Sequence, residues 1–493
     1  MASDFGDQAV WTRIGVGPAI RAESMEGWIL VPATAATQPS HTVPASGAGA
    51  TPPSRRLPTL SGWGRVPVVP GREVRDEDLR SITADVGLTR GLGRAYGDAA
   101  LPAPGDLTVA GSTLADRLLD FKPQTGELVA EAGFSLDQLY RVFLPRGWFT
   151  PVSPGTRFVT LGGMVAADVH GKNHHRAGCF GEHVSALTLR TADGSILRCS
   201  RDVHADLFLA TLGGMGLTGH ILDVTVRLER VASPWILEET ERIDDIDTFV
   251  TRLKDSGTRW PMTAGWADCL PGRSLGRAIL YRGRWAEPQE APTEFPTLPA
   301  SLPVPFVMPQ FVLSRTAVRL HNTARFLAHR PRQRRGVVHP KQFFYPLDVV
   351  DHWHRLYGRR GFIQYQCVLP DSAPSDAPRR LLELVARHGP GVFLCVIKDC
   401  GPEGSGLLSF PMSGISFALD VPMRGPETQS LTDRLNEFVI AHGGRIYLAK
   451  DALTRPEHFR AMEPRLERFL AVRRRWDPQG RIRSAQSIRL FGW

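Results

Sequence analysis

The stretch of sequence that decides the fold runs from residue 154 to residue 175 and reads PGTRFVTLGGMVAADVHGKNHH. Small residues recur in it at close spacing, and a second run of this kind, LFLATLGGMGLTG, follows at residues 207–219. Successive turns of small residues let the backbone lie flat against a ligand and turn its N–H groups toward an anion. The pattern therefore predicts a binding surface for a large planar ligand that carries a pyrophosphate.

A third glycine-rich stretch lies upstream and reads TRGLGRAYGD at residues 89–98. Its three glycines fall within seven residues, and Arg94 lies among them, so the backbone there is also suited to an anion. The spacing is GxGxxxG, which differs from the dinucleotide fingerprint GxGxxG, and no strand–helix unit is evident around it. By itself this stretch is typical of ordinary turns.

Two other kinds of site are disfavoured by the same residues. His170 and His174 are four residues apart, but Gly171 argues against a helix, and Asp168 is the only carboxylate close by in the sequence. A metal site is therefore not expected. The sequence holds no GxSxG elbow, which disfavours a Ser-His-Asp hydrolase.

The composition is that of a globular enzyme. The 493 residues include 59 basic and 50 acidic side chains, so the net charge is 59 − 50 = +9, and 42% of the residues are hydrophobic. Two or three domains, or one large interleaved pair, are expected at this length, and a fibrous or wholly disordered chain is excluded. The six cysteines form no CxxC pair, and neither a signal peptide nor an apolar run of about 18 residues is seen. We therefore expect free thiols and a cytoplasmic location.

Local patterns predict several elements. Residues 134–143 form the clearest helix, with apolar side chains at a spacing of three and four and a capping box of Ser135 and Gln138. Further helices are expected near 379–388, 431–442 and 461–476. In the strand 362–368, Gln364 and Gln366 share one face. Residues 1–58, rich in Pro, Ala, Ser and Thr, are expected to be a flexible extension.

Residues 295–347 depart from the average composition. They contain no Asp or Glu but seven arginines and Lys341, a charge of +8, and an apolar stretch broken by prolines (298–313) lies among them. This combination suits an anionic membrane surface or a substrate with a phosphate and a lipid tail. A solvated arginine-rich loop is the plain alternative. Nucleic-acid binding is disfavoured because no recognised motif or aromatic platform accompanies the charge.

The order of the motifs GLGRAYGD, PGT, TLGG, HGKNHH and LFLATLGG resembles the vanillyl-alcohol-oxidase-type flavoproteins. Within them the chain is similar to the decaprenylphosphoryl-β-D-ribose 2′-oxidase family, from about residue 60 to the C-terminus and including GFIQYQ, SFPMSG and IYLAKD. The resemblance implies an α+β fold with a PCMH-type FAD-binding domain at 59–233. It further implies an inserted antiparallel-sheet substrate domain at 234–444, a segment at 445–493 that returns to the first domain, and non-covalently bound FAD.

The resemblance also implies site residues, matched motif by motif. The FAD contacts would be Thr89, Arg90, Gly91, Leu92, Gly93, Arg94, Ala95, Tyr96, Gly97, Asp98, Ala99, Gly155, Thr160, Leu161, Gly162, Gly163, Ala167, Asp168, Val169, His170, Ile221 and Tyr447. The substrate side would hold Lys172, Trp266, Gln364, Gln366, Lys398, Ser416 and Ala418. The catalytic residues would be Lys450, His170 and Tyr96.

Elementary chemistry agrees with these roles. Oxidation of a secondary alcohol sends a hydride to the flavin and requires a base for the hydroxyl proton. Lys450 suits that role if burial lowers its pKa, and Tyr96 or His170 could share it. Lys172 and Lys398 suit a phosphate, and the two glutamines suit sugar hydroxyls.

Plain structural readings stay open beside these roles. Lys450 could be a surface lysine, His170 a packing residue, and Gln364 and Gln366 solvated strand residues. Strand parity places Tyr447 and Lys450 on opposite faces, so a turn or bulge is needed for both to reach one site.

The sequence departs from the family pattern at two places. Ser416-Phe-Ala418 stands where the family usually has Asn-x-Cys, and Phe344 replaces a tyrosine. The resemblance implies that the cysteine is the attachment site of covalent nitroaromatic inhibitors, so such compounds should bind here only reversibly. These departures bear on sugar specificity more than on reaction type.

The expected function is FAD-dependent oxidation of the 2′-hydroxyl of a polyprenyl-phosphoryl-β-D-ribose to the 2′-keto product. In actinobacteria this would be the first half of an epimerisation to the arabinose donor for cell-wall arabinan. The expected partners are an NADH-dependent keto-reductase, a quinone or O2 as electron acceptor, and the inner face of the plasma membrane as a peripheral surface. The alternatives are a sugar or alditol oxidase of the same fold and a non-catalytic lipid- or polyanion-binding relative.

Overall fold

The computed structural model describes residues 57–270, 275–297 and 301–492. The flexible extension expected at 1–58 lies outside the described residues apart from its last two. Residues from Pro58 onward form one unit that contains all the sheets described below. No helix within the described ranges is long and apolar enough to cross a bilayer.

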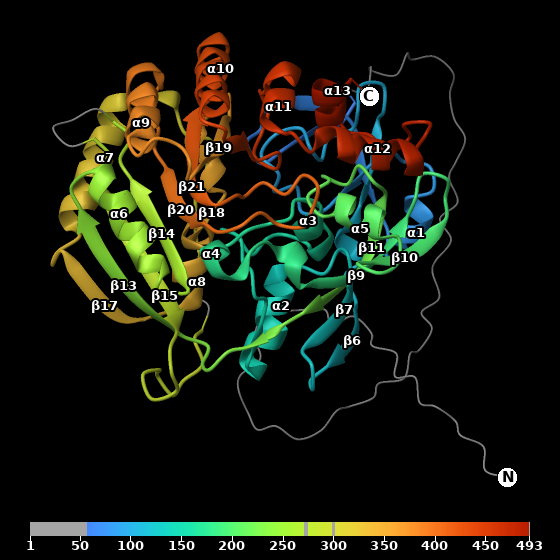
Figure 1. Ribbon diagram of the computed structural model, residues 1–493, viewed down its shortest axis with the longest axis horizontal. Helices are drawn as coiled ribbons and strands as arrows, with labels where there is room; N and C mark the ends of the chain where they lie inside the picture. The colour runs from blue at the N-terminus through green and yellow to red at the C-terminus, as the bar shows by residue number, and fades with distance from the viewer. Residues whose placement is uncertain (1–56, 271–274, 298–300, 493) are drawn as a thin grey trace, which may run out of the picture. The chain divides into compact units, whose positions relative to one another are not determined.

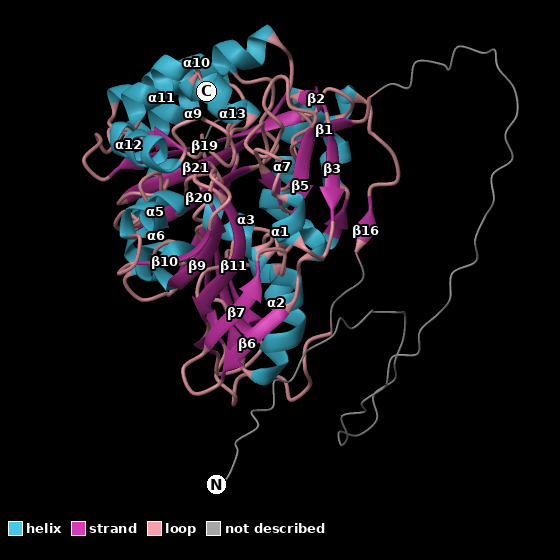
Figure 2. Cartoon of the chain, turned by 90° about the vertical axis from the view of Figure 1, so that its right-hand side faces the viewer, coloured by secondary structure: helices cyan, strands magenta, loops and turns pink. Residues whose placement is uncertain are grey.

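A five-stranded antiparallel sheet forms the core of the N-terminal half (Figure 2). Its strand order is β10-β9-β11-β7-β6, and α2, α3 and α5 pack against it around a core of buried aliphatic and aromatic residues. The bounds are β6 Leu118–Lys122, β7 Glu127–Glu131, β9 Val184–Arg190, β10 Ile196–Ser200, β11 His220–Arg227, α2 Leu136–Phe143, α3 Leu161–Ala166 and α5 Ala205–Thr211.

A small parallel sheet stands beside it, in the order β3-β5-β4. Its strands are β3 Arg72–Arg75, β4 Thr89–Arg90 and β5 Thr108–Gly111. The glycine-rich loop from Gly91 onward leaves directly from the end of β4, so this sheet fixes where the loop begins.

An eight-stranded antiparallel sheet, in the order β17-β13-β15-β14-β20-β21-β19-β22, forms the second layer (Figure 1). One face is covered by α6, against which α9 packs, and by α10. The bounds are β13 Ile236–Ile243, β14 Met262–Ala267, β15 Ala278–Trp285, β17 Gln333–Val338, β19 Phe362–Pro370, β20 Cys395–Cys400, β21 Gly414–Pro422, β22 Arg445–Ile446, α6 Ile246–Gly257, α9 Ala377–His388 and α10 Pro426–Ala441.

The alternation along β19 shows how this sheet divides its two faces. Ile363, Tyr365 and Cys367 belong to the hydrophobic core. Gln364 and Gln366 point to the other face, which lines a cavity. The predicted common face of the two glutamines is therefore confirmed, and the face is buried rather than solvated.

The remaining elements connect these layers. The two-residue and three-residue strands pair as β1 Thr59–Ser61 with β2 Val68–Pro70, β8 Trp148–Phe149 with β12 Glu229–Arg230, and β16 Leu302–Pro303 with β18 Val350–Asp351. The other helices are α1 Leu79–Ile82, α4 His174–Ala177, α7 Arg315–Ala328, α8 Pro340–Phe344, α11 Pro456–Met462, α12 Leu466–Trp476 and α13 Ala485–Phe491. Short 3₁₀ turns cover Ser112–Leu114, Leu144–Arg146, Phe180–His183, Gln310–Leu313, Pro346–Val349 and Trp353–Tyr357.

Most of the predicted helices are confirmed, and one is wrong. The capping box forms as expected, because the Ser135 hydroxyl accepts from the Gln138 N–H while the Gln138 side chain accepts from Ser135 N–H. Residues 461–476 are not one helix: α11 ends at Met462 and α12 begins at Leu466. Pro464 disfavours helical geometry at the residue before it, which explains the break.

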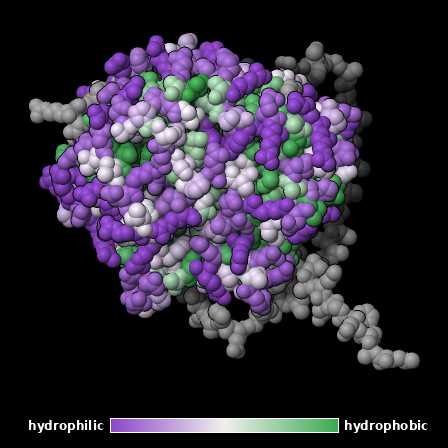
Figure 3. Space-filling view, viewed as in Figure 1, coloured by the Kyte–Doolittle hydropathy of each residue, from purple (hydrophilic) through white to green (hydrophobic). Residues whose placement is uncertain are grey.

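The surface and the thiols are those of an ordinary globular protein. On the face shown in Figure 3, hydrophobic residues form small patches among hydrophilic ones. All six cysteines are free and buried.

Candidate active site

A cavity of about 530 Å³ lies where the two layers meet. One wall comes from the glycine-rich loop after β4 and from residues of the 153–172 and 215–221 segments. The opposite wall comes from the free face of the eight-stranded sheet and from α7 and the turns after α8. Its volume falls within the range of about 300–1,000 Å³ that is usual for small-molecule sites.

The first wall is built of small residues. A Cβ added at Gly155 meets no atom within 4 Å, so any side chain there would project into the cavity. A Cβ at Gly91 would approach the Thr160 hydroxyl to 2.4 Å, so only glycine fits at this closely packed turn. This wall therefore offers exposed backbone to a flat, phosphate-bearing ligand, which is what FAD requires.

Most of the expected FAD contacts lie in this wall. The expected FAD contacts that line the cavity are Thr89, Gly91, Leu92, Gly93, Arg94, Ala95, Tyr96, Ala99, Gly155, Thr160, Gly162, Gly163, Ala167, Val169, His170, Ile221 and Tyr447. The cavity lining defined by the described residues leaves out Arg90, Gly97, Asp98, Leu161 and Asp168.

Two of these five residues hold the glycine loop from behind. The Arg90 guanidinium donates to Ser61 O at 2.8 Å and to Ala100 O at 3.0 Å. Asp98 accepts two hydrogen bonds of 2.8 Å from Arg489. Both side chains therefore fix the path of the loop.

Gly97 and Leu161 are positioned by packing. A Cβ at Gly97 would come within 2.0 Å of Asp451 O, so the backbone of the loop touches the C-terminal segment there. Leu161 is fully buried in the hydrophobic core at the start of α3.

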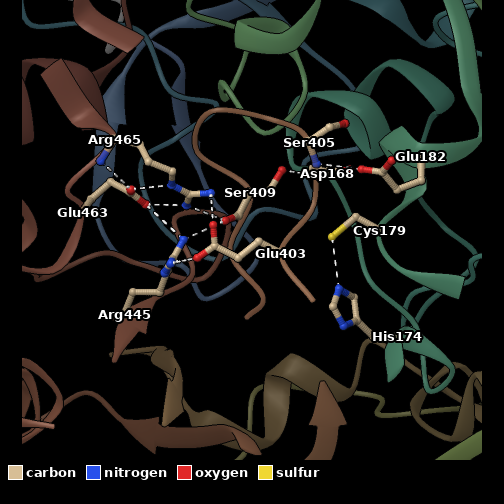
Figure 4. A network of polar contacts seen from close by, with 10 residues as sticks. All are labelled: Asp168, His174, Cys179, Glu182, Glu403, Ser405, Ser409, Arg445, Glu463 and Arg465. Carbon is tan, nitrogen blue, oxygen red and sulfur yellow. Dashed lines mark hydrogen bonds and ion pairs between the residues drawn. The ribbon is translucent and has the colours of Figure 1, made fainter. Parts of the chain in front are cut away.

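Asp168 is held by a loop that comes from the other layer (Figure 4). Its carboxylate accepts a hydrogen bond from Gly181 N at 2.7 Å and another from the Ser409 hydroxyl. In the same loop, Ser405 N donates to Glu182 at 2.7 Å, and Glu403 pairs with Arg445. Burial raises the pKa of Asp168 to about 6, while the hydrogen bonds from Ser409 and Gly181 favour its charged form. The loop thus couples the two layers beneath the cavity.

Lys450 and Tyr96 meet at the junction of the two walls. Residues 448–450 form a turn, closed by a hydrogen bond of 2.9 Å from Lys450 N to Tyr447 O. This turn brings both Tyr447 and Lys450 to the cavity, as strand parity required. The Lys450 Nζ lies 4.1 Å from the centre of the Tyr96 ring. Tyr96 N donates to Ala449 O at 2.9 Å and so fixes the pair.

A hydrogen-bonded chain supports these two side chains. Gln364 Nε2 donates to the Tyr96 hydroxyl at 3.3 Å and to Asp420 at 2.5 Å. The Tyr357 hydroxyl donates to the second Asp420 oxygen at 3.1 Å. Asp420 is fully buried, and this burial raises its pKa to about 6. Sequence reasoning missed Asp420. It lies four residues after Ser416 on the same strand, and this spacing places both residues on one face of the strand.

The electrostatics select among the three expected catalytic residues. Burial, together with the positive charge of Lys398, lowers the pKa of Lys450 to about 7 against the opposing effect of Asp420. Burial raises the pKa of Tyr96 well above its usual value, so its hydroxyl keeps its proton. Of Lys450 and Tyr96, Lys450 is therefore the group that can act as a base near neutral pH.

His170 faces the same cavity from the glycine-rich wall and contacts β19 across it. Gln366 Nε2 lies 2.8 Å from His170 Nε2 and 3.3 Å from the Ser416 hydroxyl. Burial and the charge of Lys398 hold the pKa of His170 well below its ordinary value, so the imidazole is neutral. Ser416 is buried behind Gln366 rather than in the wall, whereas Ala418 lies in the wall.

His170 and His174 do not share a helix, because α4 begins at His174. His174 instead contacts Cys179, with Nε2 at 3.4 Å from the sulfur. Among the described residues, no group of three or more His, Cys, Asp or Glu is placed to hold a metal ion.

Two further lysines line the substrate side of the cavity. Lys172 Nζ donates to Phe344 O at 3.1 Å, and burial with the charge of Lys398 lowers its pKa to about 7. Burial lowers the pKa of Lys398 to about 8. Glu238 of β13, which sequence reasoning missed, also lines the cavity, and burial raises its pKa to about 7 despite Lys172. Nothing in the local sequence distinguishes Glu238 from its neighbour Glu239.

The outer part of the cavity is aromatic and basic. Trp266 lines it, and the Arg325 guanidinium lies 4.8 Å from the Trp266 ring centre. Arg325 was noted in the sequence only as one of the arginines of residues 295–347, and Trp353 was not noted. Their contact with the cavity depends on how α7 and the turn after α8 pack. Phe344 lies in the wall where the family pattern has a tyrosine.

Comparison with known proteins agrees with this geometry. Residues 86–200 match a family described as an FAD binding domain. The chain is 34% identical over 454 residues to the decaprenylphosphoryl-beta-D-ribose oxidase of Mycolicibacterium smegmatis, which covers 87% of this chain and 97% of that protein. It is 37% identical over 370 residues to an uncharacterized protein of Streptomyces coelicolor, covering 72% of this chain and 99% of that one.

A more distant relative shares one part of the chain. The L-gulonolactone oxidase of Mus musculus is 30% identical over 145 residues, which are 28% of this chain and 32% of that protein. The likeness to the mycobacterial oxidase, in contrast, extends over both layers. The chain is an FAD-dependent oxidoreductase with a PCMH-type α+β fold and belongs to the decaprenylphosphoryl-β-D-ribose oxidase family.

Proposed function

We propose that the protein oxidises the 2′-hydroxyl of a polyprenyl-phosphoryl-β-D-ribose to the 2′-keto product. The observation that carries the proposal is the meeting of two half-sites in one cavity. A wall of exposed backbone suited to FAD faces three partly buried lysines, Lys172, Lys398 and Lys450, and the side chains of Gln364 and Gln366. This set offers a base, sites for an anion, and amides for sugar hydroxyls.

The protein's own residues divide the work. When bound, FAD supplies the hydride acceptor for the carbinol carbon. Neutral Lys450 takes the hydroxyl proton, and its pKa of about 7 leaves a large fraction uncharged at neutral pH. Tyr96, protonated and fixed by Gln364, orients the hydroxyl, and neutral His170 with Gln366 holds the neighbouring hydroxyl.

The phosphate would lie beside Lys172 and Lys398. Both side chains are partly buried in the cavity wall, and an incoming phosphate would stabilise their charged forms. Glu238 beside Lys172 limits how much negative charge this end accepts. Trp266 and Arg325 would hold the glycosyl phosphate where the prenyl chain leaves the cavity.

We propose a domain division that follows the sheets. Sheets built from residues up to 230 support an FAD-binding domain at 59–233, and the eight-stranded antiparallel sheet supports an inserted substrate domain at 234–444. The segment 445–493 contributes β22 to that sheet and then returns to the first domain through α12, which packs on α5. Lys450 therefore lies where the chain passes between the two.

The chain's place in a reaction sequence follows from its product. A 2′-keto sugar must be reduced on the opposite face to give the arabinose epimer. We therefore propose an NADH-dependent keto-reductase as partner and a quinone or O2 as electron acceptor. This would be the first half of the conversion that supplies arabinose for cell-wall arabinan.

Anaerobic titration of the purified protein tests the proposal. Flavin absorbance should bleach on addition of polyprenyl-phosphoryl ribose, and Lys450→Met should abolish bleaching while the flavin stays bound. Lys122→Gln, which removes an exposed lysine paired with Glu127, is the control and should bleach normally. Bleaching by free pentoses or alditols but not by the lipid-linked sugar would contradict the proposed substrate. A protein that cannot be reconstituted with flavin would contradict the reaction itself.

A further inference from the structure

The C-terminal helix α13 contacts both segments that carry the proposed base and the tyrosine beside it. Its Ala485 N–H donates to Leu101 O at 3.0 Å, just after the glycine-rich loop. Its buried Gln486 side chain donates to Leu448 O at 2.8 Å, in the turn that carries the lysine. One short helix thus binds two segments that lie far apart in the sequence.

Arg489 of the same helix joins the two segments through charge. Its guanidinium donates two hydrogen bonds of 2.8 Å to Asp98 and a third, of 2.7 Å, to Asp451. Asp98 lies two residues after Tyr96, and Asp451 directly follows Lys450. Both carboxylates have only 5% of their side-chain surface exposed, so this triad of ion pairs lies inside the protein. A single side chain therefore ties the backbone next to the tyrosine to the backbone next to the lysine.

Direct backbone contacts complete the connection. Tyr96 N donates to Ala449 O at 2.9 Å, and a Cβ added at Gly97 would come within 2.0 Å of Asp451 O. The two segments therefore touch. Any loosening of the triad would act on the contact of 4.1 Å between Lys450 Nζ and the centre of the Tyr96 ring. Arginine suits this position because a planar guanidinium can bind two carboxylates at once in a fixed geometry, which a lysine cannot.

The triad depends on its cation. Burial opposes the charge of Arg489, but Asp451 and Asp98 together hold its pKa above the ordinary value, so the guanidinium stays protonated. Burial also raises the pKa of Asp98, whereas the hydrogen bonds from Arg489 favour its charged form. Without the guanidinium, two buried carboxylates would repel each other, and they would move apart or one would take up a proton. Either result would displace the segments on which the catalytic side chains lie.

We propose that Arg489 is a positioning residue that holds Lys450 against Tyr96 and keeps the base buried. Arg489 is not among the described residues that line the cavity, so it acts through Asp98 and Asp451. The inference rests on the proposed function only in giving Lys450 the role of the base.

The surroundings of Lys450 determine what its displacement would change. The charged and titratable groups that face it are Asp420 of β21, Lys398 of β20, His170 and the Tyr96 ring. Burial and Lys398 lower the pKa of Lys450 to about 7, whereas Asp420 opposes this effect. If the turn loosens, water reaches the ammonium, so its pKa should rise toward the ordinary value of 10.5. A carboxylate left nearby without its cation would act in the same direction.

Titration of the lysine side chains by NMR tests the inference directly. The sequence contains six lysines, so labelling them with 13C at Cε gives few signals, and Lys450→Met identifies the one from Lys450. In the FAD-loaded parent its midpoint should lie near pH 7, and in Arg489→Gln it should lie at about pH 8 or above. Arg489→Lys keeps the charge but only part of the contact, so its midpoint should lie between these values. The control Arg483→Gln removes an arginine of the same segment that pairs with Asp106 at 2.8 Å, and it should leave the midpoint in place.

Steady-state kinetics at saturating FAD give a second readout. At pH 7, Arg489→Gln should lower kcat about 100-fold, because a small misplacement of the base is costly, and should change KM less than about twofold. The loss should shrink as the pH rises to about 9, because more of the displaced lysine is then neutral. A merely structural role of Arg489 would lower kcat by the same factor at every pH.

The outcomes separate this inference from the proposed function. An unchanged Lys450 midpoint in Arg489→Gln would overturn the positioning role, and so would a loss of kcat that is uniform across pH. If Arg489→Gln does not fold, a folded Arg489→Lys with the parental midpoint would overturn it equally. A shifted midpoint in a protein whose parent oxidises no polyprenyl-phosphoryl ribose would support the positioning of Lys450 and overturn the proposed function.

Discussion

Replacing Asp420 by asparagine should make the protein more stable and a poorer catalyst. Asp420 is fully buried, and burial raises the pKa of its carboxyl from 3.8 to about 6. A group whose pKa is raised on folding favours the folded state only at low pH, and this contribution is lost as pH rises through about 6. At pH 8 the ionised carboxylate therefore costs stability.

The size of this cost follows from the two pKa values. The difference between 3.8 and about 6 corresponds to about 3 kcal/mol at 1.36 kcal/mol per pKa unit. Asparagine has nearly the same shape and is never charged. It can keep both contacts, since Gln364 can donate to the amide oxygen and the amide NH2 can donate to the Tyr357 hydroxyl. With an unfolding entropy of roughly 2.1 cal/mol/K per residue over the folded part, Asp420→Asn should raise Tm by about 3 °C at pH 8. Near pH 4 the gain should vanish.

The same change should alter catalysis. Asp420 raises the pKa of Lys450, so its neutralisation should move the acid limb of the kcat profile to lower pH and weaken the base. Calorimetry at pH 4 and pH 8 and a kcat–pH profile measure the two effects.

A matched control separates this effect from a general effect of losing a carboxylate. At Asp433, hydrogen bonds from Arg455 and Gln429 outweigh burial and lower the pKa. Asp433→Asn should therefore destabilise at pH 8 and leave the kcat profile in place. An Asp420→Asn protein with unchanged or lower Tm at pH 8 and an unmoved acid limb would refute the reasoning.

Three further predictions concern the cavity. The rate of substrate oxidation should rise as Lys450 loses its proton near pH 7. KM should rise between about pH 7 and 8 as Lys172 and Lys398 lose their charge. Steady-state pH profiles that separate kcat from KM check both effects. The Gly155→Leu variant should purify folded but without flavin, because the leucine side chain projects into the cavity. The control Gly336→Ala, on the exposed β17, should retain the flavin. The ratio of flavin to protein absorbance measures the difference. Nitroaromatic compounds should form no covalent adduct with the parent protein, whose cysteines are all buried, and Ala418→Cys should create the adduct, as intact mass would show.

Short-range patterns predicted much of the fold. The capping box at Ser135 and the alternation of Gln364 and Gln366 depend on neighbours within a few residues, and both formed as expected. The break between α11 and α12 was also predictable from Pro464. It was missed because the apolar spacing on either side of Pro464 is typical of one continuous helix.

Site residues that belong to sequence motifs were predictable, whereas residues that only tertiary packing brings to the site were not. The motifs located the glycine-rich wall and the lysines, and most of those residues line the cavity. Asp98 and Asp168 belong to the same motifs but are held by Arg489 and Ser409, which lie more than 200 residues away in the sequence. Glu238 and Arg325 reach the cavity only because distant strands and α7 converge there, and no local pattern encodes that convergence.

Isotopic substitution of the substrate tests the central claim most directly. The anaerobic rate of flavin bleaching would be compared for polyprenyl-phosphoryl ribose carrying deuterium at C2 or at C3 of the sugar. The account predicts slower bleaching with deuterium at C2 and an unchanged rate with deuterium at C3, because only the C2–H bond is broken. A slower rate with the C3 label alone, or no bleaching with either substrate, would contradict it.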